Sequence, residues 1–372
     1  MTIVLLLALF ILAVVMPKSR LLFWIMAAYM WLLFSLNTGA PDTGTYKWIY
    51  ESAIQGAFEP LFTAIMNACS MLGMSYTGFR MVVATLLICF LNLAFNKIGP
   101  YKTLAMAIYM ISPFPWQVSG MRAALACAIL MYAMTFLFDK KEGDTYKFCI
   151  FLLLATLVHY SSILFAVMLF AGKKTSRRRT LAFLTIAVVG IIVVQNTDFL
   201  LETVSQFTSR EKILTWLSGG IYKDGYPSLK GFAAELIILA GNIFLTQVSK
   251  NTIERNDLKG ESTRIAEAIC NLNLATILFI PLLRLNDTYM RLLLVMHGVN
   301  AILYAMTALI VQEEPEVYDR QRFLSTPQCA RISLYSLSVP FWTYVIAVYQ
   351  NLPYFGTTES VLEFLGKYSM FP

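Results

Sequence analysis

Long apolar runs separated by short polar segments dominate the chain. Two runs, near residues 2–16 and 21–36, are followed by a polar stretch at 37–60. Further runs lie near 61–74, 79–95, 103–116, 119–138, 148–171, 181–196, 231–248, 265–283, 292–311 and 332–350. Because about 20 apolar residues in a helix span the hydrocarbon core of a bilayer, this pattern predicts a polytopic membrane protein. We expect one all-α transmembrane domain over residues 1–372, with about nine full spans plus partial helices.

The run 148–171 is long enough to span a membrane, but it is interrupted by His159-Tyr160-Ser161-Ser162. Non-helical backbone at membrane depth is tolerated only where protein buries it or where water reaches it, so the break indicates a cavity. Two half-helices, 148–158 and 161–171, would form a re-entrant segment that keeps both flanking basic clusters on one side. The alternative is a kinked segment that crosses the membrane twice. Residues 61–74 are predicted to form another partial helix, on the outer side.

Composition and charge support a membrane protein and give its orientation. The chain is 58% hydrophobic and 14% charged, whereas soluble domains carry about 25% charged residues. Its net charge of +7 fits the excess of Lys and Arg on the cytoplasmic side of membrane proteins, so we expect no nucleic-acid partner. The clusters assigned to that side are Lys18/Arg20, Lys97/Lys102, Lys140/Lys141/Lys147, 173–179, 250–264 and 320–331. The two large loops, 37–60 and 197–230, are then expected on the outer side.

Several chemistries find no support in the sequence. The six cysteines are scattered and form no CxxC pair, and there are only two histidines. We therefore expect neither a metal site nor a disulfide framework. The sequence contains no GxxxxGK[ST] motif and no Gly-rich fingerprint, so ATP is not an expected ligand.

The first outer loop carries two candidate carboxylates and two candidate aromatic residues. Asp42 lies in a Pro-Asp-Thr-Gly sequence that is good turn chemistry, but a carboxylate at the mouth of an apolar bundle can also be a general base. Glu59 precedes Pro60, where it can favour a helix N-terminus or act as the alternative base. Tyr46 and Trp48 are either interfacial aromatics or rings for a ligand to stack on.

Three arginines at the outer ends of apolar runs are candidates for anion binding. Arg122 begins the run ending at Phe138, where it either snorkels to the interface or pairs with phosphate oxygens. Arg284 and Arg291 flank Asp287, which can neutralise only one of them easily. We therefore predict a positively charged outer cavity.

His159 is an ionisable residue at membrane depth, which makes it a functional candidate by default. The alternative is a neutral histidine that bonds to backbone groups freed by the helix break. Arginines, carboxylates, tyrosines and a histidine around one outer cavity suit an anionic, amphipathic ligand, namely a lipid-linked phosphate or diphosphate.

The candidate residues lie in an ordered set of short motifs: Asp42-x-Gly44-x-Tyr46, Glu59-Pro60-Leu61-Phe62, Met121-Arg122-Ala123-Ala124-Leu125-Ala126, His159-Tyr160-Ser161-Ser162 and a late helix start at Arg291. This set resembles the EpsG-like branch of the Wzy-type bacterial polysaccharide polymerases, which build O-antigen and capsule. The motifs cover residues 37–165 well and the C-terminal half weakly.

This resemblance implies a GT-C-like helical bundle in the bacterial inner membrane, with a large cavity and the two loops facing the periplasm. The expected substrate is an oligosaccharide unit on undecaprenyl diphosphate, which is transferred without a cofactor. The expected roles are Asp42 as base with Glu59 as alternate, and Arg122, Arg291 and Arg284 as diphosphate ligands. Tyr46, Trp48 and His159 would contact sugar or shape the site. A chain-length-regulating co-polymerase is a possible partner under this resemblance.

Other functions remain open at the level of sequence. An O-antigen ligase shares the lipid-diphosphate chemistry, and a membrane acyltransferase could use a buried histidine such as His159. A flippase for lipid-linked sugars also suits a cationic cavity, although the sequence lacks the internal repeat frequent in transporters. The last alternative is a purely structural membrane subunit.

Overall fold

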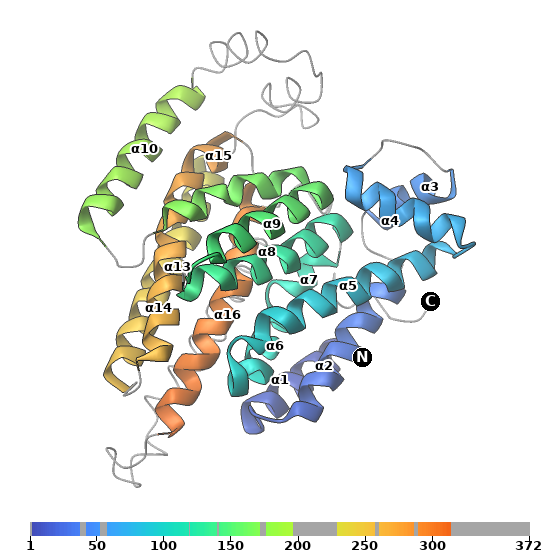
Figure 1. Cartoon of the computed structure of the whole chain (residues 1–372), viewed down its shortest axis with the longest axis horizontal. Coiled ribbons are helices and arrows are strands. Elements are labelled where there is room, and N and C mark those ends of the chain that lie inside the picture. Colours follow the sequence, from blue (N-terminus) through green and yellow to red (C-terminus); the bar gives the residue numbers. More distant parts are fainter. Residues whose placement is uncertain are drawn as a thin grey trace.

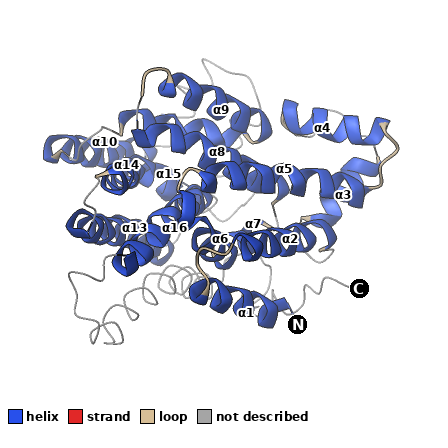
Figure 2. Cartoon of the chain, turned by 60° about the horizontal axis from the view of Figure 1, so that its bottom comes forward, coloured by secondary structure: helices blue, strands red, loops and turns tan. Residues whose placement is uncertain are grey.

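The computed structural model describes residues 2–37, 42–52, 58–118, 120–139, 141–171, 176–195, 229–256, 260–285 and 289–313. These residues form helices and no strand (Figures 1 and 2). The first half contains α1 (Thr2–Val15), α2 (Arg20–Leu36), α3 (Thr43–Glu51), α4 (Pro60–Met71), α5 (Tyr76–Asn96), η1 (Gly99–Tyr101), α6 (Lys102–Ile111), α7 (Phe114–Gln117) and α8 (Met121–Asp139). The second half contains α9 (Asp144–Val158), η2 (Tyr160–Phe170), α10 (Arg177–Gln195), α13 (Leu229–Asn256), α14 (Glu261–Ala275), η3 (Thr276–Phe279), α15 (Ile280–Leu285) and α16 (Met290–Glu313).

The predicted all-α, multi-pass membrane architecture is confirmed. Five helical stretches in the described part are long and apolar enough to cross a membrane: Tyr76–Asn96, Met121–Phe138, Gly231–Arg255, Glu261–Leu285 and Met290–Leu309. Shorter apolar helices include α1, α2, α4 and η2. The expected span at 332–350 and most of the outer loop 197–230 lie outside the described residues, so the total of nine spans stays a prediction.

α16 is the most enclosed of the five candidate spans, since every residue from Leu292 to Leu309 is buried. Gly298 explains how closely α16 approaches α8: a Cβ there would lie 2.5 Å from the Met131 sulfur. On another side, Asn300 and Asn273 of α14 exchange amide hydrogen bonds of 2.7 and 3.1 Å. Each buried amide thereby has a partner, which a polar group inside a membrane bundle requires.

α3 and α4 lie together at one end of the molecule, beside the start of α5 (Figure 1). The guanidinium of Arg80 on α5 donates to the carbonyl oxygens of Phe34 and Asn37. These are among the last carbonyls of α2, which have no partner within their own helix. These hydrogen bonds give the buried Arg80 side chain a structural role, because they join α5 to the end of α2.

Two local expectations differ from the observed helices. The polar stretch 37–60 was expected as a loop, yet it contains α3, because Tyr46, Ile49 and Tyr50 form one buried face at helical spacing. The run 103–116 was expected to be continuous, but it is divided between α6 and α7 at Pro113, since proline cannot continue a helix without losing a hydrogen bond.

The break in the run 148–171 is confirmed. α9 ends at Val158, His159 is extended with φ −154° and ψ 113°, and η2 follows. The two segments pack against each other in the bundle, and α9 also packs along α8 (Figure 1). The break therefore places His159 at the end of α9, near the first turn of α8.

Candidate active site

Arg122, the second residue of α8, is held from three sides. Its Nη1 forms an ion pair of 2.5 Å with Glu59 Oε2, and its Nε donates to Tyr46 Oη over 3.0 Å. The guanidinium carbon lies 4.4 Å from the ring centre of Phe58, a geometry in which the ring face attracts the cation. The Arg122 side chain keeps 25% of its surface exposed. The guanidinium is thus fixed in orientation while part of it stays open to a ligand.

Glu59 is the hub of this cluster, because its carboxylate joins three segments of the chain. Its Oε2 pairs with Arg122 at the start of α8. Its Oε1 lies 3.1 Å from His159 Nδ1 and accepts the backbone N–H of Tyr160 over 3.2 Å, at the break after α9. Glu59 itself precedes Pro60, the first residue of α4, and only 5% of its side chain is exposed.

The contacts of Glu59 determine its protonation. Burial acts to raise its pKa, but the hydrogen bond from His159 and the charge of Arg122 outweigh burial and lower the pKa to about 2. Glu59 is therefore ionised near neutral pH and only accepts hydrogen bonds, so His159 donates to it through Nδ1. A carboxylate with so low a pKa is a poor proton acceptor.

Asp42 lies in the same neighbourhood but in a different electrostatic environment. It precedes α3, and its side chain makes no capping hydrogen bond to that helix. Burial raises the pKa of Asp42, although the positive charges of Arg291 and Arg122 act in the opposite direction. Asp42 therefore takes up a proton more readily than Glu59 does, and both arginines lie near enough to influence it.

Aromatic rings form one wall of the site. The rings of Tyr46 and Phe58 are stacked with centroids 5.0 Å apart, and Phe62 meets Phe58 edge to face at 5.5 Å. Phe62 in turn contacts Phe79 of α5 at 5.6 Å. Phe58 and Phe62 were not predicted as site residues. Their positions close to Glu59-Pro60 in the sequence could have suggested a role in the site. Aromatic residues are too common in this chain for that spacing to be specific.

Four of the eight predicted site residues share direct contacts, and Asp42 interacts with Arg122 and Arg291 through their charges. Tyr46, Glu59 and His159 are in direct hydrogen-bonded contact with Arg122 or with one another. Trp48 follows Tyr46 by two residues, about 200° around a helix, and is 61% exposed on the other face of α3. Arg284 on α15 has its guanidinium 5.8 Å from the ring centre of Phe232 on α13.

Asp287, the expected local partner of Arg284 or Arg291, lies outside the described residues. Within the described ranges, His, Cys, Asp and Glu residues form no group of three that could hold a metal ion. The large outward cavity expected around the arginines stays a prediction.

Comparison with known proteins gives one match. The model of the EpsG family matches residues 20–354, which is most of the chain. The match includes Tyr46, Phe58, Glu59, Arg122 and His159, which together form the Arg122 cluster. No curated protein matches the chain, and no solved structure does.

Proposed function

The chain belongs to the EpsG family, which is associated with exopolysaccharide biosynthesis, and on this basis we propose that it is a polysaccharide polymerase. Its substrate is an oligosaccharide repeat unit carried on undecaprenyl diphosphate. The observation that carries the proposal is the fixed, partly exposed guanidinium of Arg122, with Asp42 and Arg291 in its electrostatic neighbourhood. A site of this kind can bind a diphosphate and accept a proton without a nucleotide.

The proposed reaction forms one glycosidic bond and breaks one. An acceptor hydroxyl oxygen bonds to the anomeric carbon of the donor sugar, and the bond from that carbon to the lipid diphosphate breaks. The electron pair of the broken bond leaves with the diphosphate, where negative charge increases in the transition state. Arg122 and Arg291 stabilise this charge, because preorganised cations in a site of low dielectric pay little reorganisation at the moment of reaction.

The two carboxylates have different roles in this proposal. Asp42 takes the proton of the acceptor hydroxyl, since its raised pKa makes it the better proton acceptor. Glu59 positions Arg122 and His159 instead, because it is buried, ionised and fully engaged in hydrogen bonds. His159 Nε2 and the Tyr46–Phe58 wall are available to the sugar. Arg284 is a more distant contributor to the positive field.

The proposed location is the bacterial inner membrane, with the Arg122 cluster facing the periplasm. The basic clusters of the chain favour this orientation, because Lys and Arg are enriched in cytoplasmic loops. A chain-length-regulating co-polymerase is a further proposed partner, and no docking surface for it is assigned.

Incubation of the purified protein in nanodiscs with its undecaprenyl-diphosphate-linked repeat unit, without nucleotide, tests this function. A ladder of polymer on a gel is the expected result. If no ladder forms while the same unit crosses liposome bilayers that contain the protein, the protein is a flippase. Transfer of glycan or acyl groups without chain growth would identify a ligase or an acyltransferase.

Arg122→Lys provides the sharpest variant for this assay. A lysine has a single point charge and cannot bond Tyr46 and Glu59 while offering a planar edge to diphosphate. We expect polymer formation to fall by about 100-fold, as on loss of a transition-state donor. Arg178→Lys, at an exposed position on α10, is the matched control and should retain full activity. Equal activity of the two variants would exclude the assigned role of Arg122.

A further inference from the structure

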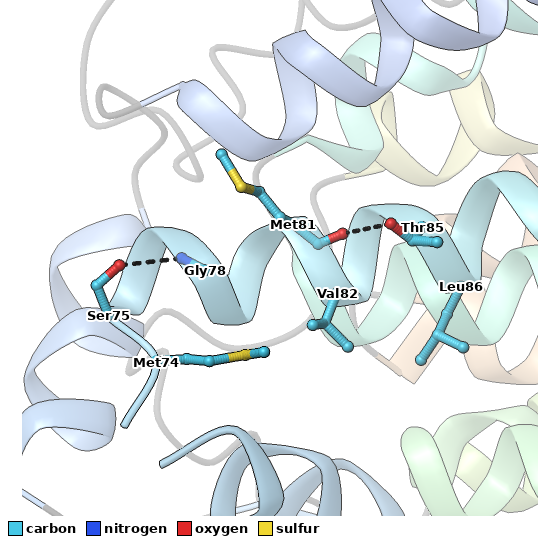
Figure 3. Close-up of a pocket in the computed structure, with 7 residues that line it drawn as sticks. All are labelled: Met74, Ser75, Gly78, Met81, Val82, Thr85 and Leu86. Carbon is cyan, nitrogen blue, oxygen red and sulfur yellow. Dashed lines mark hydrogen bonds between the residues drawn. The ribbon is translucent and has the colours of Figure 1, made fainter. Parts of the chain in front are cut away.

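A groove of about 530 Å³ runs along one face of α5, away from the Arg122 contacts. Its lining begins at Met74 and Ser75 and continues along α5 through Gly78, Val82 and Leu86 (Figure 3). The lining combines two small residues, Ser75 and Gly78, with the larger side chains of Met74, Met81, Val82 and Leu86. From Ser75 to Leu86 the groove follows about 16 Å of helix at 1.5 Å per residue.

The polar atoms of the groove are satisfied within the protein, so the surface it presents is apolar. Ser75 Oγ accepts the backbone N–H of Gly78 over 3.2 Å. Thr85 Oγ1 donates to the Met81 carbonyl over 2.8 Å (Figure 3). It also accepts the indole N–H of Trp31 over 3.0 Å. α5 is a candidate membrane span, and every residue that lines the groove is exposed or only partly buried, so we expect this face to meet the hydrocarbon of the membrane.

The outer end of the groove is tied to the helix that carries Tyr46. Tyr50 on α3 donates to the carbonyl oxygen of Met74 over 2.8 Å, and Tyr76 donates to the carbonyl of Thr43 over 3.3 Å. Tyr50 lies one helical turn from Tyr46, which bonds Arg122. On the face of α5 that packs into the protein, Phe79 contacts both Tyr50 and Phe62. The anion-binding guanidinium and the apolar groove therefore flank the same short helix.

We propose that this groove binds the first isoprenoid units of the polyprenyl chain while the attached diphosphate lies at Arg122. The inference rests on the proposed function, because that function supplies a ligand with an anionic head and a long, methyl-branched apolar tail. A cationic site and an apolar groove beside one helix are complementary to such a molecule. The adaptable side chains of Met74 and Met81 suit an irregular, methyl-branched chain.

Val82→Phe tests the groove by filling it, and Leu93→Phe is the matched control. Leu93 is on the same helix and 42% exposed, but it does not line the groove. For substrate with the full polyprenyl chain, we expect Val82→Phe to raise KM about tenfold, while Leu93→Phe leaves KM unchanged. For an analogue in which a methyl group replaces the whole polyprenyl chain on the diphosphate, KM should be the same in all three proteins. An equal effect of Val82→Phe on both substrates, or no effect on either, would overturn the inference.

Photolabelling tests the same groove without catalysis and with the unaltered protein. A polyprenyl diphosphate with a diazirine in its second isoprene unit should label residues 74–86, and undecaprenyl phosphate should compete, whereas an equal amount of phospholipid should not. Two results would overturn the inference, because each would show that the groove takes up any membrane lipid. One is labelling that phospholipid suppresses as strongly as undecaprenyl phosphate does. The other is labelling of Leu93 to the same extent as residues 74–86. Failure of every substrate to polymerise together with labelling of residues 74–86 would reject the proposed reaction alone.

Discussion

Two carboxylates near one arginine have different environments, and this difference decides their chemistry. Glu59 is enclosed by hydrogen-bond donors that favour its charged form, whereas burial dominates at Asp42. The sequence identified both as candidates but could not rank them, because the ranking depends on contacts made by residues 63 and 100 positions away. Tyr46 and Trp48 were both expected as rings for a sugar, and α3, which the sequence pattern did not reveal, turns the two side chains to opposite faces.

The raised pKa of Asp42 predicts how activity changes with pH. A general base must be deprotonated, so the rate should fall as the pH drops through the pKa of Asp42, which lies above 3.8. Asp42→Asn should lose about 100-fold in rate, as is typical of a removed general base, and should also lose this acidic limb. Glu59→Gln should keep the limb, because Glu59 has a pKa of about 2. A pH–rate profile of each variant measures this, and a limb retained in Asp42→Asn would assign the base elsewhere.

Glu59 also predicts a contribution to stability. Its pKa is lowered on folding from 4.5 to about 2, so the stabilisation is complete above pH 4.5 and is lost as the pH falls toward 2. Near neutral pH, Glu59→Gln should destabilise the protein by about 2 kcal/mol, less than the roughly 3–5 kcal/mol of a fully buried pair because Arg122 is partly exposed. Thermal unfolding in detergent measures the effect.

Glu51→Gln is the control for that measurement. Glu51 forms an exposed ion pair of 3.8 Å with Lys47, and such surface pairs contribute about 0–1 kcal/mol. A shift in unfolding temperature for Glu59→Gln no larger than that for Glu51→Gln would contradict the structural role of Glu59.

At the scale of elements, prediction from the sequence succeeded where a strong apolar run or a clear polar interruption marked the chain. The break at His159 was predictable because polar residues interrupt an apolar run, and Pro113 could have indicated the division between α6 and α7. α3 was missed because nine residues of mixed polarity carry too short a periodic signal. Which helices meet depends on side-chain fit, as at Gly298, and periodicity does not reveal it.

The contact between α16 and α8 gives a prediction at this scale. Gly298→Ala should place a methyl group 2.5 Å from the Met131 sulfur, so the helices must separate or Met131 must move. We expect a lower unfolding temperature, equivalent to about 1–3 kcal/mol for overpacking. Gly241→Ala on α13 is the matched control, since a Cβ there meets nothing within 4 Å, and replacing helical Gly by Ala favours the helix by roughly 0.5–1 kcal/mol. Destabilisation by both substitutions to the same degree would contradict this account of the interface.

At the scale of the whole molecule, the apolar pattern alone predicted a multi-pass helical bundle, and charge predicted its orientation. α3 and the Arg122 cluster should lie outside, and the first turn of α9 should lie inside. After replacement of the six native cysteines, Trp48→Cys and Tyr146→Cys provide probes at positions 61% and 71% exposed. A membrane-impermeant maleimide should label position 48 in spheroplasts, and position 146 only after permeabilisation. The opposite pattern would invert the proposed topology.

The bridging of three segments by Glu59 has a consequence for the biogenesis of the protein. The ribosome makes Glu59 first, its ion-pair partner Arg122 later, and His159 and Tyr160 last. In a nascent chain that ends before α9, Glu59 Oε1 therefore lacks its two hydrogen-bond partners, His159 and Tyr160. Charged groups that lack partners are costly in a membrane. The contacts of Glu59 are completed only when α9 and η2 have been inserted, so the order of translation makes them one of the last features of the N-terminal half to form.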